Sequence, residues 1–134
     1  IRHMADTLAE CDPHTIWECY NPTEPKPALN KCKRQVRKDF CGWSALGPVA
    51  LMLENVIGIY HISASDNTIH WQLSGKSRRG IRNLHFGENC VDLIAQNGVV
   101  KIVAQNKFNL ILNGRTIPCS AGESVLSAEP ENLS

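Results

Sequence analysis

The second half of the chain alternates between apolar and polar residues, whereas the first forty residues show no such period. The alternating runs are short, rich in Val and Ile, and include VIGIYHIS, TIHWQL, CVDLIAQ, VVKIVA and FNLIL. A period of two places every second side chain on the same face of a β-strand, so the pattern predicts strands. We therefore expect an antiparallel sheet over residues 57–128.

Two Asn-Gly pairs, Asn97-Gly98 and Asn113-Gly114, separate consecutive runs. A type I′ turn needs positive φ at both central residues, which Asn and Gly adopt at low cost. Both pairs therefore predict tight hairpins. Because no helical pattern interrupts the runs, we expect a β-meander that forms a small barrel or a sandwich.

The stretch before the strands predicts a helix over residues 41–56. PVALMLEN contains good helix formers, and Pro48 suits the first turn of a helix because its missing N–H would be unpaired there anyway. The fold class is therefore α+β, with one or two short helices ahead of the sheet.

Residues 5–40 are punctuated by proline. Pro22, Pro25 and Pro27 lie within six residues of one another and forbid a helix there, which predicts an extended strap. We expect one domain over 5–134, with a flexible tail at 129–134, and interpret residues 1–4 as vector-derived.

Composition excludes some classes of protein. The chain has 134 residues, of which 43% are apolar, enough for a core, and its 14 basic and 13 acidic residues give a net charge of +1. No run approaches the roughly 18 apolar residues that a membrane helix requires, so we expect no membrane span. A secretory leader removed ahead of residue 1 would leave no trace in this sequence.

Cysteine is abundant and even in number, at Cys11, Cys19, Cys32, Cys41, Cys90 and Cys119. The even count, the wide spacing and the small size favour disulfides, which we expect in particular to pin Cys11, Cys19 and Cys32. A structural zinc site prefers close pairs, and only Cys11 and His14 offer one. Reduced thiols are the third interpretation. We predict no metal site and no cofactor.

Cys41-Gly42-Trp43 opens the predicted helix and His70-Trp71 opens a predicted strand. This pair of motifs resembles those of papain-like and ovarian-tumour-like cysteine proteases, although only 28 residues separate Cys41 from His70. The resemblance implies Cys41 as nucleophile and His70 as base, with Asp66 or Asp92 as the acid that orients the histidine. The alternative is a structural Cys41, which we favour because the third catalytic group is not evident.

A second arrangement joins His85 to Glu88-Asn89-Cys90. It resembles the His and Asn-Cys elements of lecithin retinol acyltransferase-like and NlpC/P60-like thiol hydrolases. In those families the nucleophile begins a buried helix, whereas the run after Cys90 has the pattern of a strand. We therefore interpret Cys90 as a disulfide partner or a core residue.

Basic residues gather in two places. The candidate binding residues are Lys33, Arg34 and Arg37 in the first cluster and Arg78, Arg79 and Arg82 in the second. Such clusters bind anions through an electrostatic term, and neighbouring aromatic residues would add base stacking. Phe40 and Trp43 accompany the first cluster, and Trp71 and Phe86 the second. Solvated surface charge is the simpler interpretation.

Taken together, small size, six cysteines and the proline-rich strap predict a secreted, disulfide-stabilised, non-enzymatic module that binds another macromolecule, most simply a protein. Such modules serve as host-directed effectors or virulence factors. A cysteine protease built on Cys41 and His70 is one alternative. A nucleic-acid-binding domain that uses the two basic clusters is the other.

Overall fold

The computed structural model describes residues 2–36 and 40–128. The chain folds into two compact units, an N-terminal unit of Ile1–Met52 and a C-terminal unit of Leu53–Ser134. The expected tail at 129–134 and Arg37 lie outside the described residues, and the expectation of one domain stays a prediction.

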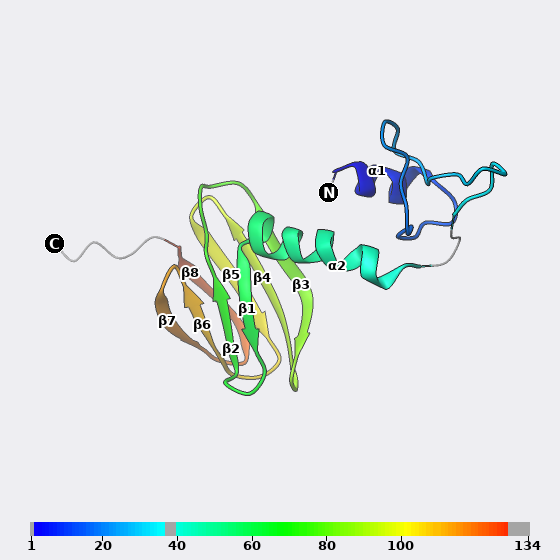
Figure 1. Cartoon of the computed structure of the whole chain (residues 1–134). Coiled ribbons are helices and arrows are strands. Elements are labelled where there is room, and N and C mark those ends of the chain that lie inside the picture. Colours follow the sequence, from blue (N-terminus) through cyan, green and yellow to red (C-terminus); the bar gives the residue numbers. More distant parts are fainter. Residues whose placement is uncertain (1, 37–39, 129–134) are drawn as a thin grey trace. The chain divides into compact units, whose positions relative to one another are not determined.

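The N-terminal unit contains two helices joined by irregular chain (Figure 1). Helix α1 spans Arg2–Glu10 and helix α2 spans Gly42–Leu51. Between them the described residues make two isolated bridges, Tyr20 with Pro27 and Leu29 with Gln35. The proline-rich stretch is therefore non-helical, as predicted, but α1 occupies the first residues of the expected strap.

Helix α2 begins earlier than the proline suggested. It starts after Cys41, so Pro48 lies inside the helix and not in its first turn. The helix tolerates Pro48 at the cost of one backbone hydrogen bond. Helical chain continues directly as the π-helix η1, Met52–Ile57, and ends at Gly58, whose φ of 95° requires glycine. Together α2 and η1 therefore confirm the helix expected over residues 41–56.

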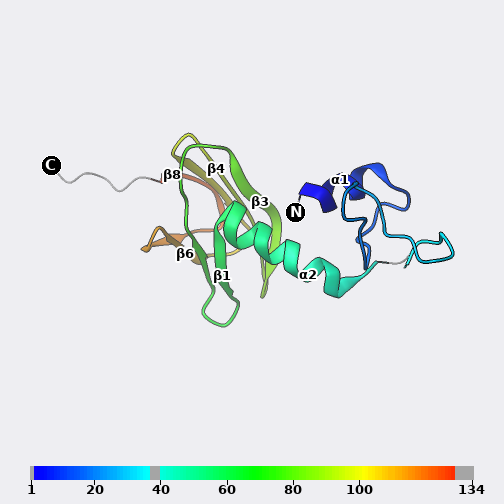
Figure 2. The ribbon, with the colours of Figure 1, turned by 45° about the horizontal axis from the view of Figure 1, so that its top comes forward.

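The C-terminal unit is a β-sandwich of eight strands, which confirms the α+β class with strands after helices (Figures 1 and 2). One sheet has the order β1-β2-β6-β7 and the other β3-β4-β5-β8. The strands are β1 (Ile59–Ser63), β2 (Thr68–Trp71), β3 (Arg79–Phe86), β4 (Asn89–Gln96), β5 (Val99–Ala104), β6 (Phe108–Leu112), β7 (Arg115–Cys119) and β8 (Gly122–Ser127). The described strands form two open sheets and not a closed barrel.

Local pairing follows the sequence closely. The Asn97-Gly98 and Asn113-Gly114 pairs join β4 to β5 and β6 to β7, and all four residues have positive φ. Both predicted hairpin turns are therefore confirmed. Non-local pairing departs from a simple meander, because β2 and β6 run parallel.

The core lies between the two sheets and is built from the inward side chains of both. Its fully buried members are Ile69, Trp71, Leu93, Val100, Ile102 and Leu110. Burying such a side chain stabilises the fold by roughly 1.5–3 kcal/mol. The Trp71 indole Nε1–H also donates to the Ile57 carbonyl at 2.8 Å, which ties η1 to the sandwich.

Candidate binding surfaces

The second basic cluster lies at the start of strand β3, on the sheet β3-β4-β5-β8. Along β5 the residues Val100, Ile102 and Ala104 are buried, so Val99, Lys101 and Val103 occupy the opposite, outer face. That outer face carries a groove of about 350 Å³, which we call the basic groove. It is lined by Arg78, Arg82, Asp92, Ile94, Gln96, Val99, Lys101 and Val103.

Three valines of this face are exposed: Val99 (48%), Val103 (37%) and Val125 on β8 (61%). Val125 lies directly opposite Lys101 in the β5–β8 register. An adjoining hollow of about 390 Å³ continues along β3, between Arg79 and Ile94. The face therefore combines aliphatic surface with guanidinium groups.

The charges of the groove are only partly balanced. Lys101 pairs with Glu123 at 2.7 Å, and the Asp92 carboxylate accepts the backbone N–H of Asn83 at 2.8 Å. Among the residues that the structure describes, neither Arg78 nor Arg82 forms an ion pair. Their guanidinium groups are therefore available to an anionic partner.

The first basic cluster belongs to the N-terminal unit. Lys33 has a positive φ of 58°, and the backbone N–H of Arg34 donates to the Asn30 side chain at 3.1 Å. The exposed Lys33 and Arg34 are thus placed by a turn that Asn30 caps. That the two clusters meet on one face stays a prediction, since they belong to different units.

Aromatic residues near the second cluster do not form the expected stacking platform. Trp71 is 0% exposed and Phe86 is 7% exposed, because both point into the sandwich core. The expectation that they flank the charges is wrong: the alternation of β2 and β3 directs them inward. In the N-terminal unit Phe40 and Trp43 are exposed.

Cys41 and His70 each have local partners. Cys41 is 1% exposed, its backbone N–H donates to the Ile16 carbonyl at 2.9 Å, and its Sγ accepts the Ser44 hydroxyl at 3.5 Å. A nucleophile must reach its substrate, so this burial supports the structural interpretation of Cys41.

The His70 side chain lies on β2 beside β1. Its Nδ1 is hydrogen-bonded to the Tyr60 hydroxyl at 3.4 Å, and its ring contacts that of His61 edge-on, with centroids 4.9 Å apart. Asp66 is bonded to Ser63 at 2.8 Å within the β1–β2 loop. His70 thus belongs to an aromatic cluster on strands, and its pairing with Cys41 stays a prediction.

His85 and Cys90 are brought together as cross-strand partners on β3 and β4. The Cys90 Sγ lies 3.6 Å from the His85 Nε2. Cys90 belongs to a strand, as expected, but its side chain is half-buried and points away from the core. The strand at Cys90 is therefore confirmed and lacks the helix N-terminus that the resemblance to thiol hydrolases implies, whereas the interpretation of Cys90 as a core residue is wrong.

All six cysteines fall within the described residues, and the structure shows each as a free thiol. The predicted disulfides are therefore absent from it, and their formation in solution stays a prediction. Cys19 and Cys32 are exposed, whereas burial raises the pKa of the Cys119 thiol above its usual range.

Within residues 2–36 and 40–128, no three metal-binding side chains of the His, Cys, Asp and Glu types cluster. No helix in those ranges is long and apolar enough to span a membrane.

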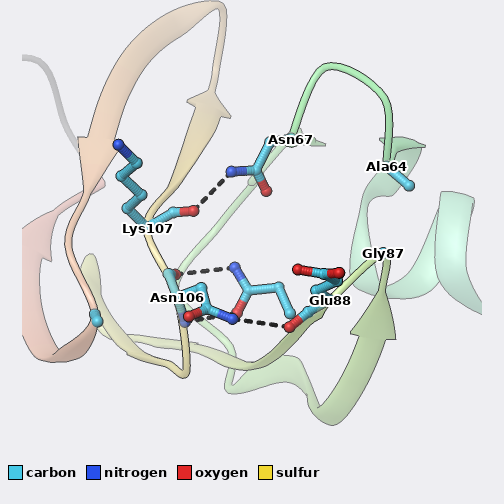
Figure 3. Close-up of a pocket in the computed structure, with 8 residues that line it drawn as sticks. Ala64, Asn67, Gly87, Glu88, Asn106 and Lys107 are labelled. Atoms are coloured by element: carbon cyan, nitrogen blue, oxygen red, sulfur yellow. Dashed lines mark hydrogen bonds between the residues drawn. The ribbon is translucent and has the colours of Figure 1, made fainter.

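A cavity lies at one end of the sandwich, where connections from both sheets meet (Figure 3). Its volume is about 710 Å³, and it is lined by Ala64, Asn67, Gly87, Glu88, Asn89, Asn106, Lys107 and Ala121. These residues come from four connections, β1–β2, β3–β4, β5–β6 and β7–β8. We call this site the loop-end cavity.

Asparagine side chains fix the walls of the loop-end cavity. Asn89, 4% exposed, donates to the Asn106 carbonyl at 2.9 Å and accepts the Asn106 N–H at 3.0 Å. The Asn106 side chain donates to the Glu88 carbonyl at 2.8 Å, and that of Asn67 to the Lys107 carbonyl at 2.7 Å. Loops from both sheets are thereby joined.

The sequence pattern did not single out this cavity. One signal was available: the connections ASDN, GEN and QNK each contain Asn and follow alternate strands. In a meander, alternate connections lie at the same end of the sheet. The recurrence of Asn in them could therefore have indicated a shared polar site.

Comparisons with known proteins give one relative. The chain is 29% identical to an uncharacterized protein of Borreliella burgdorferi over 139 aligned residues, which cover 91% of this chain and 29% of that protein. The chain therefore spans less than a third of that relative's length. No family model matches, and no solved structure matches significantly.

Proposed function

We propose that the protein is a non-enzymatic binding module whose basic groove holds an acidic segment of another protein. The observation that carries the proposal is the position of Arg78 and Arg82 beside exposed valines on one outer sheet face. Exposed aliphatic surface next to unpaired guanidinium groups fits a partner with alternating acidic and apolar side chains.

Charge complementarity favours an acidic partner over a basic one. The carboxylates at the groove are already engaged, Glu123 by Lys101 and Asp92 by the Asn83 N–H. The two arginines have no such partner among the described residues. Guanidinium groups bind carboxylates in a bidentate geometry, which gives orientation as well as affinity.

The groove fits a protein better than a nucleic acid. Single-stranded nucleic acids bind by base stacking on aromatic side chains, and among the described residues the groove is lined by no aromatic residue. Trp71 and Phe86, the nearest aromatic residues in sequence, are buried. Phosphates alone would be held by few cations, which predicts weak binding that salt abolishes.

Fluorescence anisotropy of a labelled short peptide of alternating Glu and Val tests the proposal, with a labelled oligothymidylate as the competing probe. We expect Arg82→Glu to weaken peptide binding by about 10-fold or more, because charged hydrogen bonds contribute roughly 1.5–3 kcal/mol. Val103→Ser should also weaken it. Lys107→Glu, a charge reversal at an exposed residue that does not line the groove, is the matched control and should leave binding unchanged.

Equal peptide affinity of the wild type and Arg82→Glu would refute the proposal. Tighter binding of the oligonucleotide, insensitive to Val103→Ser, would favour the nucleic-acid alternative.

The proposal includes secretion and disulfide formation in the N-terminal unit. Its described residues bury few side chains, namely Thr7, Trp17, Cys41 and Ala45. So small a core supports little stability without cross-links, and four of the six cysteines lie in this unit. Oxidation of thiol pairs by the machinery of a secretory compartment would supply them. A module of this kind would act on a host macromolecule, as effectors and virulence factors do.

Mass spectrometry of natively secreted protein, alkylated under denaturing conditions with and without reductant, tests this part. We expect Cys11, Cys19 and Cys32 to become alkylated only after reduction. Alkylation of all six cysteines without reductant would refute it.

A further inference from the structure

We infer that the loop-end cavity binds a neutral, polyhydroxylated ligand, that is, a carbohydrate unit. The cavity is separate from the basic groove: the two share no lining residue. Its volume of about 710 Å³ falls in the range of sites for small molecules.

The cavity is fixed before any ligand binds. Asn89 and Asn106 clamp the β3–β4 and β5–β6 connections together, and Asn67 clamps the β1–β2 loop to Lys107. Small residues keep the space open, since Ala64 and Ala121 lie on its wall. Gly87 has a φ of 54° and faces Ala64, so a larger residue there would be strained. A preformed site loses little conformational entropy on binding.

The same clamps determine which polar atoms remain for a ligand. The Asn67 and Asn106 side chains each use Nδ2 to bond a carbonyl, and no hydrogen bond among the described residues engages either Oδ1. Glu88 and Lys107 form no ion pair among those residues. Figure 3 shows the Glu88 carboxylate on the side of the cavity toward Gly87, and the Lys107 side chain extending away on the opposite side.

This set of groups selects the chemistry of the ligand. Two amide oxygens and one carboxylate on the lining accept hydrogen bonds, and the hydroxyl groups of a sugar can donate to all three. One negative and one positive side chain leave the site neutral, which disfavours strongly charged ligands.

Other ligand classes fit less well. A phosphate or nucleotide would face the Glu88 carboxylate and two amide oxygens, and the lining offers no aromatic ring to stack on a base. Calcium takes six to eight oxygen ligands, more than these side chains provide. A small amine is the closest competitor, because an ammonium group could donate to Glu88 and the two amides.

Titration of the ¹⁵N-labelled full chain with cellobiose, chitobiose or putrescine, followed by NMR, tests the inference. We expect a disaccharide at roughly 20 mM, above the millimolar Kd of weak sites, to shift the side-chain amide signals of Asn67 and Asn106. Asn67→Ala removes both the free Oδ1 and the clamp to Lys107, so it should weaken binding by about 10-fold or more. Asn109→Ala, on the exposed face of β6, is the matched control.

Glu88→Gln separates the two closest ligand classes and leaves the clamps intact, since Asn106 bonds the Glu88 backbone. This variant keeps an acceptor but loses the charge, so saccharide affinity should change less than about 3-fold, whereas amine binding should be lost. Shifts with putrescine alone would overturn the inference in favour of an amine site. No shift with any of the three probes would refute it.

Discussion

The two hydrogen bonds between Asn89 and Asn106 can be tested for their contribution to the stability of the sandwich. Asn89 is 4% exposed and makes two hydrogen bonds, of 2.9 and 3.0 Å, to the backbone of Asn106. Asn89→Ala removes both bonds. Each contributes about 0.5–1.5 kcal/mol net, and the exposed position of Asn106 lets water reach its freed groups, so we expect a loss near 2 kcal/mol.

Asn89→Asp distinguishes a hydrogen-bond effect from simple packing. The carboxylate still accepts the Asn106 N–H, but its other oxygen then faces the Asn106 carbonyl, which previously accepted a donor. At pH 7 this variant should be at least as destabilised as Asn89→Ala. At low pH the protonated carboxyl group regains a donor, so the loss relative to wild type should shrink as pH falls.

The assay is urea unfolding followed by the backbone NMR signals of Leu93 and Ile102, both fully buried in the C-terminal unit. These signals report on that unit alone, whereas tryptophan fluorescence would mix both units. A loss of about 2 kcal/mol corresponds to a Tm lower by roughly 10 °C for a unit of this size. If Asn89→Ala matched the exposed control Asn109→Ala, or if Asn89→Asp lost the same stability at both pH values, the clamp would be refuted.

Three further predictions concern the backbone, the core and the thiols. Gly80→Ala should destabilise the sandwich by roughly 2 kcal/mol, because Gly80 has a φ of 152° and a Cβ there would overlap a carbonyl of β4; Gly47→Ala, where a Cβ meets open space, should not. Trp71→Phe should cost about 2 kcal/mol in urea unfolding, through the lost bond to Ile57 and a small void. In reduced protein, Cys119 should react with iodoacetamide more slowly at pH 8 than the exposed Cys19 and Cys32, and its rate should keep rising at higher pH, because burial raises its pKa. Equal rates at pH 8 would contradict the last expectation.

The strands and hairpins could be predicted because their causes are local. The Asn97-Gly98 turn follows from the conformational freedom of two residues, and the β5 run from alternation that any strand with one buried face requires. Which strands pair across the sequence has no such local cause. The parallel pairing of β2 with β6 depends on how side chains from both sheets fill one core, and equally apolar runs do not specify it.

The basic groove also combines features that the sequence predicts with features that it does not, here within the single strand β3. The charges of Arg78, Arg79 and Arg82 are evident in the sequence, but the face that each occupies depends on register. Arg79 lies opposite Ala95 and lines only the adjoining hollow, whereas Arg78 and Arg82 line both the basic groove and that hollow. Register therefore determines which part of the outer surface each arginine reaches.

Register also brings residues that are distant in sequence onto the basic groove. Val99, Lys101 and Val103 are distant from Arg82 in sequence, yet the β4–β5 pairing places them on the same groove. The loop-end cavity arises in the same way, from Asn67, Asn89 and Asn106 on three separate connections. Both surfaces are therefore properties of the sandwich topology. A substitution that shifts the register of β3, such as Gly80→Ala, should disturb the basic groove and leave the Asn67–Lys107 clamp intact.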